Sequence, residues 1–198
     1  MGPLSLLLGY LLGAIPSGYL AGRWCKGIDL RHLGSGSTGA TNVLRQVGKG
    51  PALVVFLIDV AKGAAAVLLA GSLTPGQEWL EVLAGLAALA GHIWPVWLGF
   101  KGGKAVATGL GLFLGLAWPV GLACFGIFLT TLSVFRIVSL SSVVAAISLP
   151  LLMAAGTDGS AKLVVALVAM GLVIWRHRSN LQRIVAGNEP RLGQQGQR

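Results

Sequence analysis

The chain has 198 residues, of which 55% are hydrophobic and 11% charged, with a formal net charge of +9. A mean hydropathy of +0.79 excludes an ordinary soluble domain, which needs far more polar surface. The same hydropathy argues against nucleic acid as the partner of the positive charge, and favours anionic lipid headgroups. The two cysteines, Cys25 and Cys124, indicate neither a disulfide framework nor a metal site.

Apolar stretches long enough to cross a bilayer core of about 30 Å recur along the whole chain. The stretch 103–134 is too long for one crossing, and Trp118-Pro119 is its natural break. Each half would be a short helix of about 24 Å. The sequence therefore predicts one membrane domain over 1–198 with seven spans, two of them short: 3–22, 51–71, 79–98, 103–118, 119–134, 139–155 and 161–175.

The basic residues test this topology. All of the 15 Lys and Arg except Lys62 and Lys162 fall on one side of the seven-span arrangement. The positive-inside rule then places the N-terminus outside and the C-terminus in the cytoplasm. We expect an all-α polytopic protein of the cell inner membrane, whose polar clusters face the cytoplasm.

The first polar cluster is the segment 34–45, GSGSTGATNVLR. Glycines let backbone amides converge, hydroxyls add donors, and a helix that starts there would favour an anion at its N-terminus. Arg45 would add a bidentate cation. The alternative is a flexible polar loop. The candidate residues are Gly34, Ser35, Gly36, Ser37, Thr38, Gly39, Thr41, Asn42 and Arg45.

The second cluster, 91–108, contains Lys-Gly-Gly-Lys at 101–104. The amides of Gly102 and Gly103, together with Lys104, predict a second phosphate site, and a basic loop that serves topology alone is the alternative. His92 is either a general base or a hydrogen-bonded orienting residue. Asp59 and Lys62, three residues apart inside a span, indicate an intramembrane ion pair.

The third cluster, 175–190, is either a basic juxtamembrane tail or a folded cap, as the spacing of Asn180, Arg183 and Glu189 suggests. Ser139, Ser141 and Ser142 open a helix on the same face and serve as donors or as helix caps. Two glycine-rich basic loops on one face suggest two phosphate groups bound side by side. The scarcity of carboxylates on that face argues against a metal-dependent phosphotransfer site.

These clusters together resemble the three cytoplasmic motifs of the bacterial acyl-phosphate:glycerol-3-phosphate acyltransferase family, PlsY. The residues that carry the resemblance are Gly-Ser-Gly-x-x-Gly-Ala-Thr-Asn from 34, Gly-Gly-Lys at 102–104 and Asn-x-x-Arg-x-x-x-Gly-x-Glu from 180, with Gly-Ala-Ile-Pro-Ser-Gly-Tyr-Leu at 13–20 similar to the family's opening. The resemblance implies transfer of a fatty acyl group from acyl phosphate to the 1-hydroxyl of glycerol 3-phosphate, without metal or cofactor and in a monomer.

The same resemblance implies roles for single residues. Ser35 and Arg45 would act on the acyl phosphate, Lys104 would stabilise developing charge, and His92 is a further catalytic candidate. Phosphate or substrate contacts would come from the other candidates, among them Ser142, His177, Asn180 and Arg183. An activated anhydride needs no covalent acyl-enzyme, and the donor phosphate could take the hydroxyl's proton itself.

Three other classes compete with an acyltransferase. An organic-phosphate transporter would need a polar path to the outer face, where the spans are apolar. A lipid-headgroup phosphotransferase would need acidic metal ligands. A purely structural scaffold would need none of the three clusters.

Overall fold

The computed structural model describes residues 1–157 and 159–194, in which every regular element is a helix. Arg198, one of the basic residues assigned to the cytoplasmic side, lies outside them. The chain forms two compact units, Met1–Leu116 and Ala117–Arg198. The helices are α1 (Gly2–Gly13), α2 (Ser17–Lys26), η1 (Leu30–His32), α3 (Ala40–Gln46), α4 (Lys49–Leu73), α5 (Glu78–Ile93), η2 (Val96–Leu98), α6 (Val106–Leu116), α7 (Trp118–Phe135), α8 (Val138–Gly156), α9 (Ser160–Arg176) and α10 (Arg178–Val185).

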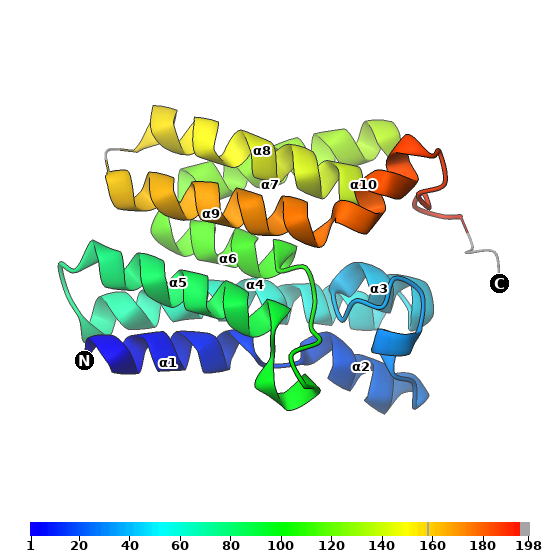
Figure 1. The fold of residues 1–198 in the computed structure, drawn as a ribbon, viewed down its shortest axis with the longest axis horizontal. Helices are drawn as coiled ribbons and strands as arrows, with labels where there is room; N and C mark the ends of the chain where they lie inside the picture. Colours follow the sequence, from blue (N-terminus) through cyan, green and yellow to red (C-terminus); the bar gives the residue numbers. More distant parts are fainter. Residues whose placement is uncertain (158, 195–198) are drawn as a thin grey trace. The chain divides into compact units, whose positions relative to one another are not determined.

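The first unit is a bundle in which α1, α4 and α5 contact one another and α6 packs on α4 (Figure 1). Small residues make these close approaches possible, as is usual between membrane helices. A Cβ added at Gly13 would collide with the Ala88 backbone, and one added at Gly63 would collide with the carbonyl of Thr108. At these two positions the helix backbones therefore meet directly, with no side chain between them.

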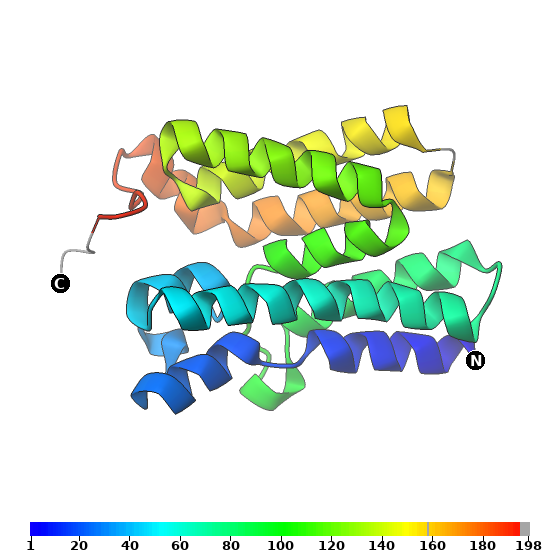
Figure 2. The same cartoon turned by 180° about the vertical axis from the view of Figure 1, so that it is seen from behind.

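The first span is broken, whereas the sequence predicted one helix over 3–22. The chain unwinds between α1 and α2, as seen in the blue segment of Figure 2. Pro16 lacks an N–H and cannot continue the α1 hydrogen-bond pattern. The freed carbonyl of Ile15 accepts hydrogen bonds from the Ser17 amide at 3.0 Å and from Lys62 Nζ at 3.1 Å. A buried cation on α4 thus supports the break.

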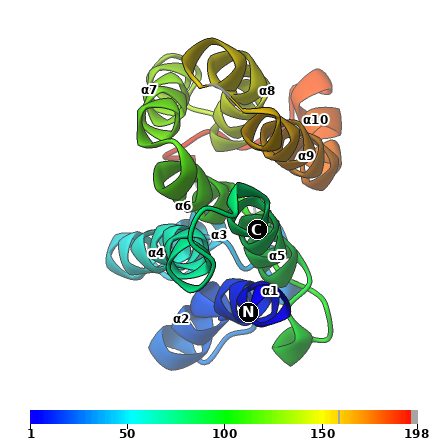
Figure 3. The ribbon, with the colours of Figure 1, turned by 90° about the vertical axis from the view of Figure 1, so that its left-hand side faces the viewer.

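The second unit packs α7 on α8 and α8 on α9, so that the three helices run alongside one another in the end-on view of Figure 3. At His177 the chain bends by 59° between α9 and α10. The short helix α10 contacts both α8 and α9. Its position makes the third polar cluster a folded cap, as one of the two sequence interpretations proposed.

In the described part of the chain, five helical segments are long and apolar enough to cross a membrane, and a sixth appears if α9 and α10 count as one bent span. Most predicted span boundaries lie within three residues of the helix ends. The predicted break near Pro119 is confirmed, because α6 ends at Leu116 and α7 begins at Trp118. The equal division was wrong: α6 has only 11 residues, and α7 with 18 is not short.

Candidate functional site

The first polar cluster forms the loop that follows η1 and continues into α3, on which Thr41, Asn42 and Arg45 lie. Gly34 and Gly36 have φ values of +59° and +66°, which a residue with a Cβ adopts only with strain. Ser35 and Arg45 are exposed, Thr41 is half-buried, and the hydroxyls of Ser37 and Thr38 lie on buried residues. The loop therefore turns some of its predicted donors outward and packs the others into the protein.

Asn42 holds this loop together from inside. It is 1% exposed, and its Nδ2 donates to the carbonyls of Leu30, Leu33 and Ser37 at 3.2, 3.0 and 2.9 Å. Its Oδ1 accepts from the Ser35 amide at 3.3 Å. Buried backbone groups of a loop have no helix or sheet partners, so other groups of the protein must satisfy them. The sequence placed Asn42 among the substrate-binding residues, and in the structure its side chain is used to shape the loop.

The loop amides are also committed within the protein. The Gly36 amide donates to the carbonyl of Leu33 and the Gly39 amide to Ser37 Oγ, in addition to the Ser35 amide bonded to Asn42. The glycines led us to expect backbone amides that converge on an anion. In the structure these three amides are hydrogen-bonded within the protein instead. The predicted side-chain donors, above all Ser35 and Arg45, are the groups at its surface.

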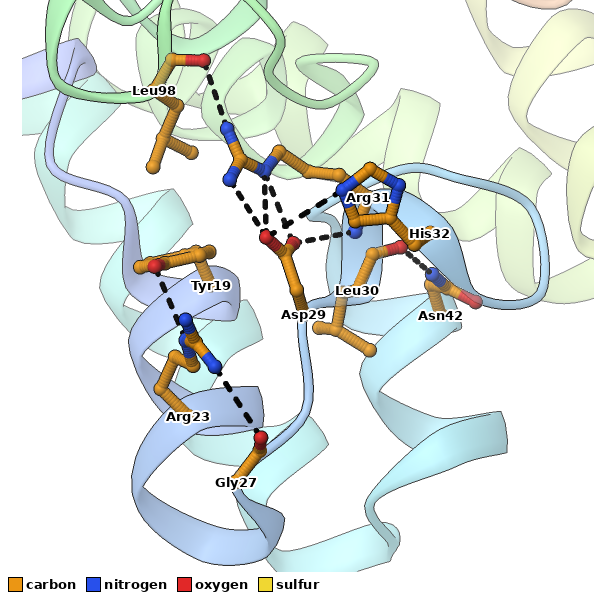
Figure 4. Close-up of polar contacts among 9 residues, drawn as sticks. All are labelled: Tyr19, Arg23, Gly27, Asp29, Leu30, Arg31, His32, Asn42 and Leu98. Carbon is orange, nitrogen blue, oxygen red and sulfur yellow. Dashed lines mark hydrogen bonds and ion pairs between the residues drawn. The ribbon is translucent and has the colours of Figure 1, made fainter.

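Arg31, on η1 just before this loop, hydrogen-bonds to the second polar cluster and is held by an ion pair with Asp29 (Figure 4). Arg31 Nη2 lies 2.7 Å from Asp29 Oδ2, and Arg31 Nη1 donates to the carbonyl of Leu98 at 3.1 Å. The guanidinium also stacks over the ring of Tyr19. The hydrogen bond from Arg31 lowers the pKa of the Asp29 carboxyl to about 2. Sequence reasoning treated Arg31 only as part of the charge bias, because its partner lies 67 residues away.

The Lys-Gly-Gly-Lys loop packs against the end of α5. The amides of Gly102 and Gly103 donate to the carbonyls of Ile93 and His92 at 3.1 and 3.0 Å. A Cβ at Gly102 would collide with the carbonyl of His92, and one at Gly103 with its Nε2. The two glycines are thus required for packing, and their amides close the end of α5. That these amides face a phosphate stays a prediction.

Lys104 is half-buried at the end of this loop, and Ala105, which follows it, has φ +59°. A left-handed alanine is strained, and such strain is found most often at functional positions. The turn at Ala105 starts α6 immediately afterwards. The backbone therefore fixes the direction in which Lys104 leaves the protein interior.

His92 is 7% exposed and lies in a buried polar cluster. Its Nδ1 is 3.1 Å from Thr108 Oγ1 and 3.7 Å from Asp59 Oδ1. The predicted ion pair of Asp59 with Lys62 is confirmed, at 2.8 Å. Of the two interpretations of His92, the contacts favour a hydrogen-bonded orienting residue.

The second unit contains the remaining candidates. Glu189, buried, accepts hydrogen bonds from Asn180 Nδ2 at 2.6 Å and from Arg183 Nε and Ser139 Oγ, both at 2.7 Å. Burial alone would raise the pKa of the Glu189 carboxyl, but these bonds outweigh it and leave the pKa below its ordinary value. Asn180 and Arg183 are thus held in one arrangement on α10.

Two further candidates of this unit bond to their own helices. Ser142 Oγ donates to the carbonyl of Val138 at 2.9 Å, which is a bond one turn back and not an N-cap. His177 Nδ1 lies 2.8 Å from the carbonyl of Val173, and the residue is buried at the bend between α9 and α10. The sequence left Ser139, Ser141 and Ser142 as either donors or simple helix caps. The second interpretation was wrong, because Ile137 is the N-cap residue of α8.

Within the first unit, the structure therefore links the loop of Ser35, which leads into α3 with Arg45, to the loop that ends at Lys104. Sequence reasoning missed the residues that hold these loops, namely Ser17, Arg31 and Thr108. Ser17 comes directly after Pro16, and Thr108 lies a few residues after the glycine pair at 102–103. Both are polar side chains inside predicted spans, and this was the signal that could have identified them.

Comparison with known proteins agrees with this arrangement. The model of the family described as glycerol-3-phosphate acyltransferase matches residues 3–187. A glycerol-3-phosphate acyltransferase of Parasynechococcus marenigrum (strain WH8102) is 74% identical over 191 residues, covering 96% of this chain and 90% of the relative. One from Synechococcus sp. (strain CC9902) is 71% identical, covering 98% and 96%.

Two solved structures show the same likeness. PlsY (YgiH), an integral membrane glycerol 3-phosphate acyltransferase, matches in its glycerol 3-phosphate form with a TM-score of 0.91 and 40% identity, covering 97% of this chain and 96% of that one. Its lysophosphatidic acid form matches with a TM-score of 0.88 and 39% identity, covering 97% and 95%. On the family match over nearly its full length, the chain belongs to the PlsY family of integral membrane glycerol-3-phosphate acyltransferases.

Proposed function

We propose that this acyltransferase takes its acyl group from acyl phosphate and places it on the 1-hydroxyl of glycerol 3-phosphate. The hydroxyl oxygen attacks the acyl carbon, the bond from that carbon to the phosphate oxygen breaks, and lysophosphatidic acid and inorganic phosphate are formed. The observation that carries the proposal is the pair of loops in the first unit, joined by Arg31 and bearing Ser35, Arg45 and Lys104.

Each predicted residue has a place in this proposal. Ser35 and Arg45 bind the donor phosphate, and Lys104 stabilises the negative charge that develops on the acyl oxygen. Asn42, Gly102 and Gly103 shape the two loops. Gly34, Gly36 and Gly39 also shape the first loop. From the family resemblance, further contacts to phosphate in the first unit come from Ser37, Thr38 and Thr41. The substrate-binding roles of Ser142, His177, Asn180 and Arg183, in the second unit, stay predictions.

No covalent acyl-enzyme is part of this mechanism. Acyl phosphate is already activated, so positioning and charge stabilisation can supply most of the rate. The proton of the attacking hydroxyl goes to the departing phosphate, and His92 orients neighbouring groups. Turnover abolished by His92→Ala, with both substrates still bound normally, would instead identify His92 as the base.

The proposal also covers the setting of the reaction. The chain acts over 1–198 as one domain and as a monomer, with seven spans, its N-terminus outside and its active site on the cytoplasmic face of the inner membrane. The asymmetry of the basic residues supports this orientation. Glycerol 3-phosphate and acyl phosphate are the proposed substrates. The glycerol 3-phosphate and lysophosphatidic acid forms of PlsY support the acceptor and the product.

The test is phosphate release by the purified protein from acyl phosphate and glycerol 3-phosphate, without coenzyme A or added metal. We expect lysophosphatidic acid and phosphate in equal amounts. Lys104→Met should lower kcat about 10²–10³-fold, the usual cost of removing one group that stabilises a developing oxyanion. Lys101→Met, three residues earlier on an exposed position, is the matched control. No release from a folded wild-type protein would contradict the proposed donor, and glycerol 3-phosphate flux into vesicles without acyl transfer would favour a transporter.

A further inference from the structure

A buried cluster around Asp59 lies beside the break in the first span. Asp59 and Lys62 are 1% and 4% exposed. Asp59 Oδ1 accepts a hydrogen bond from Ser17 Oγ at 2.7 Å and lies 2.8 Å from Lys62 Nζ, which also donates to the carbonyl of Ile15. Charges inside a membrane protein are expensive to bury, and a buried pair by itself adds little stability. The stability of the Asp59–Lys62 ion pair therefore does not by itself explain why the cluster lies at this break.

On one side the cluster reaches the loop that carries Lys104. His92 Nδ1 lies 3.7 Å from Asp59 Oδ1 and 3.1 Å from Thr108 Oγ1. The opposite edge of the imidazole, at Nε2, packs against Gly103 so closely that no Cβ fits there. The Gly103 amide also donates to the His92 carbonyl. The imidazole is thus a rigid spacer between the Asp59 carboxylate and the Lys-Gly-Gly-Lys loop.

On the other side the cluster reaches the first glycine-rich loop. A cavity of about 10 Å³, room for about one water molecule, is bordered by Ser17, Thr38, Lys62 and His92. Gly18, next to Ser17, packs directly on the carbonyl of Thr38, where a Cβ would collide. The hydroxyl that binds Asp59 therefore belongs to the short turn against which the first loop is seated.

We propose that Asp59 is a positioning residue for acyl transfer. Its carboxylate fixes His92, and through it the loop that carries Lys104. Through Ser17 it also fixes the seat of the loop that carries Ser35. This inference rests on the proposed function, because it assigns Asp59 the task of holding the two phosphate-binding loops in register.

The competing explanation is that Asp59 only compensates the charge of Lys62. The two explanations differ in what happens when both charges are removed. Replacement of a buried pair by neutral residues is often neutral for stability, whereas removal of one partner is strongly destabilising. Compensation predicts that Asp59→Asn with Lys62→Met restores stability and turnover together. Positioning predicts that it restores stability alone.

The experiment compares wild type, Asp59→Asn, Lys62→Met and the double variant in thermal unfolding and in steady-state kinetics for both substrates. We expect the double variant to unfold near the wild-type temperature. Its kcat should remain about 10–100-fold below wild type, with each KM changed less than about threefold, because misplacement of catalytic groups acts on the transition state. Thr74→Val removes one buried hydrogen bond at the far end of α4 and is the matched control. We expect it to lower the unfolding temperature without lowering kcat.

Thr108→Val tests the same path without touching a charge. It removes the hydroxyl beside His92 Nδ1, and we expect a lower kcat with a loss of stability no larger than that of Thr74→Val, which also removes one buried hydrogen bond. It also decides the question if the double variant does not fold. In a His92→Gln background, Asp59→Asn with Lys62→Met should cost less turnover than in the wild-type background, because the path through His92 is already broken and only the path through Ser17 remains.

Recovery of wild-type kcat in the double variant, or an unchanged kcat in Thr108→Val, would overturn the inference. Either result leaves the proposed donor intact, since wild-type protein would still release phosphate from acyl phosphate. A wild-type protein that folds but does not use acyl phosphate would contradict the proposed function instead.

Discussion

At the scale of single residues, the Asn42 side chain makes the first loop one defined structure. Its amide donates to three carbonyls, so the loop cannot open without exposing several backbone groups at once. A buried carbonyl that loses its partner costs about 1–3 kcal/mol. The loop that presents Ser35 and Arg45 is therefore as rigid as the helix end from which Asn42 projects.

Asn42→Asp should destabilise the protein by about 2 kcal/mol or more, because an acceptor oxygen would face three carbonyl oxygens. Thermal unfolding in detergent would measure the loss. Asn188→Asp, the same chemical change at an exposed position, is the control and should leave the unfolding temperature unchanged. Equal unfolding temperatures for the two variants would contradict the role given to Asn42.

The Asp29–Arg31 pair holds the guanidinium that donates to the carbonyl of Leu98 in the second loop, and its strength depends on pH in a defined direction. The pKa of the Asp29 carboxyl is lowered from 3.8 to about 2, so the pair contributes stability above pH 4 and loses it as the pH falls towards 2. The shift corresponds to about 2 kcal/mol, and partial solvent screening reduces this to about 1 kcal/mol.

Asp29→Asn should therefore lower stability at pH 7 by about 1 kcal/mol. The difference from wild type should shrink as the pH falls from 4 to 2, which unfolding scans over that range would measure. A difference that stays constant down to pH 2 would show that the carboxylate charge is not what joins the loops.

At the scale of elements, the contact between α4 and α6 determines where α6 begins and how Thr108 meets His92. A Cβ at Gly63 would collide with the carbonyl of Thr108 and the amide of Leu112. Two helix backbones in such contact leave no flexible side chain that could move aside. The short helix α6 is thus located by backbone packing against α4.

Gly63→Ala should destabilise the protein by about 1–3 kcal/mol through overpacking and should lower turnover by displacing Thr108. Gly126→Ala on α7 is the control, because nothing surrounds that position and Ala favours a helix by about 0.5–1 kcal/mol over Gly. A Gly63→Ala protein as stable as Gly126→Ala would mean that the two helices can separate without cost.

These elements also show what sequence alone could predict. The helices α4, α8 and α9 end within about two residues of the predicted spans, because long apolar runs define them directly. The break at Pro16 was missed and the length of the predicted short helix α6 was overestimated, since both depend on partners distant in the chain, Lys62 and Gly63. The sequence singled out the glycines at 102–103 as phosphate donors. Their packing against His92 was not predicted, because such packing leaves no periodic signal in the sequence.

At the scale of the whole molecule, the open question is orientation in the membrane. The basic residues predict that the chain between α2 and α4 faces the cytoplasm and that the turn between α4 and α5 faces outside. Lys62 does not follow this charge bias, because it is buried inside the bundle and paired with Asp59. An exposed native thiol, Cys25, lies on α2 at the predicted cytoplasmic end of the first span.

Cys25 should react with a membrane-impermeant thiol reagent in inverted membrane vesicles and stay unreactive in right-side-out vesicles. Cys124→Ala removes the other cysteine, so that all labelling reports Cys25. Gln77→Cys in a Cys25→Ala, Cys124→Ala background provides the opposite reference, because Gln77 is exposed in the turn between α4 and α5 and should react only in right-side-out vesicles. Labelling of both positions from the same side would rule out a complete crossing by α4, and the reversed pattern would place the proposed active site outside the cell. Only the expected pattern puts Ser35, Arg45 and Lys104 on the side where the basic residues accumulate.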